Sequence, residues 1–81
     1  MTKMEKFKSW KEIRDWAEEH GFNNMAKRMD LNNKCWKSSG EFGRNQVLIC
    51  DAMRFAEDEE ERMLIAEEID KDCEKNYGLF E

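Results

Sequence analysis

Apolar residues recur at three- and four-residue intervals along most of this chain, which is the spacing of one face of an α-helix. Ser9 and Glu12 have the spacing of a capping box, in which each side chain accepts a hydrogen bond from an orphan backbone N–H. Gly21 suits the left-handed conformation that ends many helices. The pattern therefore predicts a first helix over residues 9–20, with four apolar side chains on one face: Trp10, Ile13, Trp16 and Ala17.

A second, shorter helix is predicted directly after this stop. Asn23 is a favourable capping residue, and the helix that it opens covers residues 24–30. We expect this helix to end near Asp30, before two consecutive asparagines. Three of its side chains should face inward: Met25, Ala26 and Met29.

A third helix is predicted over residues 41–57, because Ser38 and Glu41 form a second capping box. Its apolar residues occupy more than one stripe of the helix surface. We therefore expect it to be the central and most buried helix of the fold.

Asp58 opens a third capping box with Glu61, and the acidic residues that follow it suit the positive end of a helix dipole. A fourth helix is predicted over residues 59–76. The alternative is one unbroken helix over 42–76, but a helix of that length could not fold back over its partners in so small a domain. The sequence thus predicts an all-α, compact single-domain bundle of about four helices, with residues 1–81 as one domain.

Charge is divided unevenly along the chain. Residues 1–40 carry nine basic and six acidic residues, whereas residues 41–81 carry five basic and thirteen acidic ones, so the two parts have net charges of +3 and −8. The net charge of −5 argues against an ordinary nucleic-acid-binding protein, because contacts from Lys and Arg to phosphates supply most of that affinity. No apolar run approaches the length of a membrane span, so no membrane association and a cytoplasmic location are expected.

The residue types that carry catalysis or metal binding are sparse. Cys35, Cys50, Cys73 and His20 lack the closely spaced ligand pair that structural zinc sites use, so no metal is expected. With one histidine and no nucleophile beside it, we expect no enzyme, no catalytic residue and no cofactor. The stretch Ser38–Arg44 has the glycines and hydroxyls of an anion site, but Glu41 would repel an anion, so the question stays open.

A stretch in the second helix resembles helix-turn-helix DNA-binding proteins. Its residues Ala26-Lys27-Arg28-Met29-Asp30-Leu31 are similar to the Ala-Lys-Arg-Leu-Gly-Val stretch of that family, although Asp30 stands where its turn has Gly. The resemblance implies a DNA-binding regulator that uses residues 23–38, with Asn33, Lys34 and Lys37 facing the major groove. We treat this as the alternative function.

The acidic fourth helix suggests the main hypothesis, which is a protein-binding inhibitor or regulator. Carboxylates spaced about 5–6 Å apart on a rigid helix could occupy a basic groove that normally holds a phosphate backbone. In size, charge and helical build the chain is similar to antirestriction and anti-CRISPR proteins of phages. Its Trp16-Ala17 and Ser38–Gly43 elements also resemble short bacterial mobile-element proteins. The acidic face comprises nine residues: Glu57, Asp58, Glu60, Glu61, Glu67, Glu68, Asp70, Asp72 and Glu74.

A second candidate contact surface lies in the irregular stretch before the third helix. It combines an aromatic residue with basic ones: Lys34, Trp36, Lys37 and Arg44. Trp36 is expected to be exposed, and exposed tryptophans are enriched in binding hot spots. Together with Leu79 and Phe80 it could alternatively mark the seam of a homodimer.

Overall fold

The computed structural model describes residues 5–76, which form four helices and no strand. The prediction of an all-α bundle is confirmed, and so is the break between the third and fourth helices, because Ala56 leaves the helix with φ −61° and ψ 133°. The predicted tail contact of Leu79 and Phe80 lies outside the described residues. The helices are α1 (Trp10–Glu19), α2 (Asn23–Cys35), α3 (Gly40–Phe55) and α4 (Glu59–Asn76).

Both predicted ends of α1 are confirmed. The Ser9 hydroxyl accepts the Glu12 backbone N–H at 3.4 Å, while the Glu12 carboxylate accepts the backbone N–H of Lys8 at 3.1 Å. At the other end Gly21 has a φ of +83°, and the Phe22 N–H donates to the Ala17 carbonyl at 2.8 Å. This is a Schellman closure, which satisfies the last carbonyls of the helix.

The second helix differs from its prediction at both ends. Asn23 is the first residue of α2 rather than its cap, and the helix continues past Asp30 to Cys35. A side chain from α4 replaces the missing local cap, because the Asp70 carboxylate accepts the Met25 backbone N–H at 2.9 Å. Asn32 does not break the helix, because its side chain is fully buried and hydrogen-bonded.

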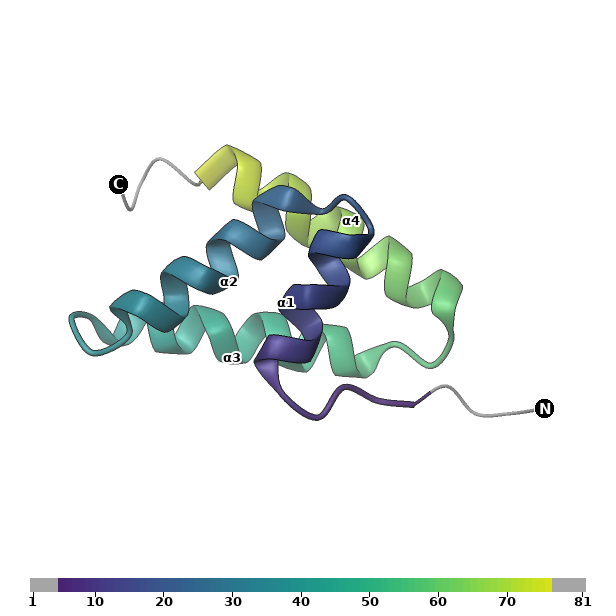
Figure 1. Cartoon of the computed structure of the whole chain (residues 1–81), viewed down its shortest axis with the longest axis horizontal. Helices are drawn as coiled ribbons and strands as arrows, with labels where there is room; N and C mark the ends of the chain where they lie inside the picture. Colours follow the sequence, from purple (N-terminus) through teal and green to yellow (C-terminus); the bar gives the residue numbers. More distant parts are fainter. Residues whose placement is uncertain (1–4, 77–81) are drawn as a thin grey trace.

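The prediction that the third helix is the central one is wrong. α2 packs against α1, α3 and α4 (Figure 1). On α3, by contrast, Val47, Leu48 and Phe55 are largely exposed. The apolar side chains of α3 extend around more of its circumference than the small bundle covers. The core cluster consists mainly of small residues and methionines: Ile13, Ala17, Met25, Ala26, Met29, Ile49, Cys50, Met53 and Ala66.

Polar side chains complete the interior between α2 and α3. Asn45 accepts hydrogen bonds from the Asn32 amide at 2.7 Å and from the Arg28 guanidinium at 3.2 Å. The Gln46 amide donates to the Met29 carbonyl at 3.0 Å. Arg28 and Asn32 are buried, so this network satisfies groups whose isolation from water would otherwise destabilise the fold.

The molecule is elongated, with principal extents of 44 × 21 × 17 Å. The α2–α3 turn lies at one end of the long axis and the α3–α4 connection lies at the other, with α3 running between them (Figure 1). Sixteen residues of helix span about 24 Å at 1.5 Å per residue. The two ends of α3 are thus held well apart.

Candidate functional site

The acidic end is the segment Glu57–Glu61, which joins α3 to α4 and forms the first turn of α4. Asp58 caps the helix, since its carboxylate accepts the Glu61 N–H at 2.8 Å, and this confirms the predicted cap. Glu59 lies 3.5 Å from the guanidinium of Arg62. Glu57 and Glu60 are exposed and form no ion pair within residues 5–76.

Arg62 neutralises only part of this end, because apart from its ion pair with Glu59 it points inward. It is buried, its guanidinium carbon lies 4.0 Å from the centre of the Phe7 ring, and it donates to the Glu5 carbonyl at 2.8 Å. The Lys6 ammonium lies nearby but binds the carbonyls of Arg54 and Ala56, at the negative end of the α3 dipole. The acidic end therefore keeps an excess of carboxylates.

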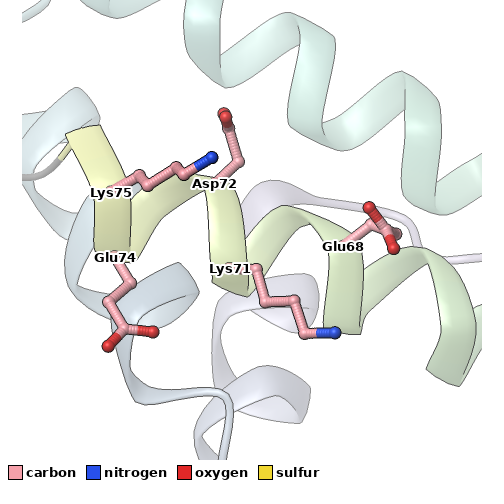
Figure 2. A pocket seen from close by; sticks show the side chains of 5 residues that line it. All are labelled: Glu68, Lys71, Asp72, Glu74 and Lys75. Carbon is pink, nitrogen blue, oxygen red and sulfur yellow. The ribbon is translucent and has the colours of Figure 1, made fainter.

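The last turns of α4 are electrically mixed. Lys71 pairs with Glu67 at 3.4 Å, and a surface hollow of about 440 Å³ is lined by three acidic and two basic side chains: Glu68, Lys71, Asp72, Glu74 and Lys75. Figure 2 shows the Lys75 side chain extending toward Asp72, while Glu74 points to another side of the helix. The predicted acidic face is thus densest at its beginning and diluted by lysines toward its end.

Asp70 differs from the other predicted acidic residues. It is half-buried, and its carboxylate binds the first turn of α2 rather than facing solvent. Negative charge at a helix N-terminus stabilises the helix through the dipole and the free N–H groups. Asp70 therefore has an internal structural role.

The basic end is formed by Lys34, Trp36, Lys37 and Arg44 around the α2–α3 turn. Trp36 is 51% exposed, as predicted, and the Lys37 ammonium lies 5.5 Å from the centre of its ring. A Cβ atom at Gly43 would lie in ordinary van der Waals contact with the Trp36 Cβ, at 3.7 Å, so Trp36 lies close to the first turn of α3. These residues gather at the end of the molecule opposite Glu57–Glu61.

The two charged ends are electrically independent at physiological salt. They are separated by about 24 Å of helix, whereas screening in 0.15 M salt acts over about 8 Å. Each end can therefore meet a different partner surface without being cancelled by the other.

The turn predicted for the helix-turn-helix does not form, because α2 is continuous through Asp30 to Cys35. A short turn containing a glycine, as such units have, instead joins α1 to α2 at His20–Phe22. The exposed strip of α2 alternates Lys27, Asp30 and Lys34. Arg14 binds Asp30 at 3.0 Å, and this hydrogen bond raises the pKa of the guanidinium. The strip is thus neither uniformly basic nor free of carboxylates.

The loop considered as an anion site functions as a helix start. Ser39, rather than the predicted Ser38, caps α3 and accepts the Glu41 N–H at 3.3 Å. Ser38 instead donates its backbone N–H to the Cys35 carbonyl at 2.9 Å. Capping accounts for the serine, and the exposed Glu41 carboxylate lies in the same first turn.

Burial disfavours reactivity at two of the three cysteines. Cys50 and Cys73 are buried, and burial raises the pKa of both thiols, that of Cys73 to about 11. Within residues 5–76 no three His, Cys, Asp or Glu side chains come together in a way that could hold a metal ion. The His20 ring stacks on the Trp16 ring with 4.3 Å between the ring centres, and the His20 Nδ1 atom lies at hydrogen-bond distance, 2.8 Å, from the Trp16 backbone carbonyl oxygen. None of the helices in this part of the chain could cross a membrane.

The exposed apolar side of α3 was not predicted from the sequence. Leu48 and Phe55 are 63% and 75% exposed, and a groove of about 280 Å³ runs between α3 and α4 beside Leu48 and Ala52. The signal was present, since the apolar residues of this helix occupy more than one stripe. That pattern was interpreted as burial on several sides rather than as a surface.

Comparison with known proteins adds no relatives. Neither the family models, nor the curated proteins, nor the solved structures contain a match to this chain. The resemblance to mobile-element proteins therefore stays a prediction.

Proposed function

We propose that this protein is a non-enzymatic binding module that presents its acidic end, with the adjoining outer side of α4, to a basic protein partner. The observation that carries the proposal is the run of five carboxylates at Glu57–Glu61, of which only Glu59 forms an ion pair within residues 5–76. The two basic side chains beside this run neutralise it only in part, because Arg62 pairs with Glu59 alone and also donates to the Glu5 carbonyl, while the Lys6 ammonium binds the carbonyls of Arg54 and Ala56.

The geometry favours a partner that normally binds a phosphate backbone. Carboxylates on successive helical turns lie about 5–6 Å apart on a rigid support, and a groove lined with Lys and Arg attracts them as it attracts phosphates. Binding of this kind would block the groove. We therefore propose an inhibitory or regulatory role of the phage anti-CRISPR or antirestriction type, with a nucleic-acid-binding protein as the partner.

Affinity capture from cells that naturally encode the protein tests this proposal. The double variant E57Q/E60Q removes two charges from the acidic end, while the control D15N/E19Q removes two from exposed positions on α1. A protein with a basic surface should be captured by the wild type and the control and be lost with E57Q/E60Q. Equal capture by all three proteins would refute the proposed surface.

Duplex DNA binding through α2 is the alternative, and the structure gives it less support. The exposed strip of α2 carries Asp30 between Lys27 and Lys34, and Glu18 lies beside it through its contact with Arg14. A mobility-shift assay at low salt distinguishes the two functions. A shift lost in K27A/K34A would favour DNA binding, and no shift would remove it.

A further inference from the structure

We propose that a second copy of this chain packs on the outer side of α3, antiparallel to the first and related to it by a two-fold axis. The inference goes beyond the proposed function, because it concerns a different helix. It begins from the largest apolar exposure in the described chain, which is on α3: Val47, Leu48 and Phe55 are 57%, 63% and 75% exposed.

The outer side of α3 has the spacing of a helix-packing stripe. Arg44, Leu48, Asp51 and Phe55 follow one another at intervals of four, three and four residues, so they lie along one line of the helix. All four are exposed, whereas Ile49 and its neighbours on the inner side are buried. A stripe of this kind is the surface that one helix offers to another.

The order of charges along this stripe is self-complementary. A two-fold axis between Val47 and Leu48 brings residues whose numbers add up to 95 to the same level, so Arg44 of each copy lies opposite Asp51 of the other. The two-fold symmetry generates this ion pair twice in the dimer. The same axis places Val47 and Leu48 of both copies together at the centre, where apolar contact would exclude water.

The ends of the stripe complement each other as well. Phe55 comes level with Gly40 of the second copy, and a Cβ atom at Gly40 would have nothing within 4 Å. The exposed Trp36 is close to that turn, so two exposed aromatic side chains would cover each other.

This arrangement favours a second copy over an unrelated partner. An unrelated partner requires no symmetry in the surface that it covers, whereas here the charged and the apolar residues of the stripe meet their complements under one axis. Part of the acidic surface also stays exposed to solvent in the proposed dimer. Glu60, Glu67 and Glu74 recur every seven residues on α4, on the side opposite the residues that line the α3–α4 groove.

Sedimentation velocity of the full chain tests the dimer, at protein concentrations up to about 1 mM and at about 50 mM salt. The mass should rise with concentration from 9.8 kDa toward twice that value. R44D and D51R should each weaken association at least about tenfold, because each brings like charges together twice. The double variant R44D/D51R should recover it, and so should a mixture of the two single variants. L48D should abolish association.

The control is L64D, which adds the same charge at an exposed leucine on α4, 60% accessible, and should leave the dimer intact. All of these positions are exposed, so circular dichroism should show unchanged folding. A wild-type chain that stays monomeric over the whole range would overturn the proposal. The proposal would also be overturned if R44D/D51R associated no more tightly than the single variants. The same holds if L48D and L64D weakened association equally. None of these results depends on the acidic surface, so the two proposals fail separately.

Discussion

Replacement of Asp70 by alanine should destabilise the fold although the residue lies on the most acidic helix. Its carboxylate accepts the Met25 N–H at 2.9 Å and thereby caps α2, which is the helix that packs against all the others. Loss of a capping hydrogen bond costs about 0.5–2 kcal/mol, and a charged acceptor at a half-buried position lies toward the upper value. We expect D70A to lower the free energy of unfolding by about 1.5 kcal/mol.

The assay is urea denaturation followed by circular dichroism at 222 nm. D70N keeps an acceptor oxygen but loses the charge, so it should cost only about 0.5 kcal/mol, the size of a helix-dipole interaction. The control E74Q removes the same charge from an exposed position one turn further along α4 and should change stability by less than about 0.5 kcal/mol. If D70A and E74Q had equal stability, the carboxylate would not be a structural cap, and Asp70 would return to the acidic surface.

Three further predictions concern two buried side chains and the turn that joins α1 to α2. N32A removes a donor from the buried network with Asn45 and should cost about 2 kcal/mol in urea denaturation, whereas a change within error would mean that water replaces it. G21A forces a Cβ into a φ of +83° and should cost about 1 kcal/mol, measured by the thermal midpoint; an unchanged midpoint would contradict the Schellman closure. Burial raises the pKa of Cys73 from 9.0 to about 11, so the unfolded thiol ionises first and the free energy of unfolding should fall as pH rises through this interval. C73A should reduce that fall, and an identical pH dependence in C73A would assign it to other groups.

Features encoded by neighbouring residues could be predicted from the sequence. Ser9, Gly21 and Asp58 were identified as helix ends because each acts on backbone groups within a few residues of itself. The start of α4 and the break before it follow from the same local chemistry. This is also why the fold class could be predicted without any tertiary information.

Features that depend on distant residues could not be predicted. α2 extends to Cys35 because Asn32 finds partners on α3, and it begins without a local cap because Asp70 arrives from α4. Arg62 was counted simply as a basic residue, yet it stacks on Phe7 from the N-terminal segment. The outer side of α3 was taken for core because an apolar stripe looks the same whether it faces an interior or a partner.

The candidate site was predicted in composition but not in distribution. The sequence located the carboxylates and the basic residues around Trp36, and the structure places the first of these carboxylates, Glu57–Glu61, at the end of α3 opposite the basic residues (Figure 1). It also removes Asp70 from the exposed set and places Lys71 and Lys75 among the remaining acidic residues (Figure 2). Those changes follow from the rotation of side chains around α4, which is set by how the helix packs.

The most direct test of the account is the salt dependence of binding to the captured basic partner. Affinity should be measured for the wild type and for E57Q/E60Q by titration calorimetry between about 50 and 200 mM salt. Wild-type affinity should fall steeply over this range, and the variant should bind more weakly with a shallower dependence. An affinity that does not change with salt, or the same dependence in both proteins, would show that these carboxylates do not carry the interaction.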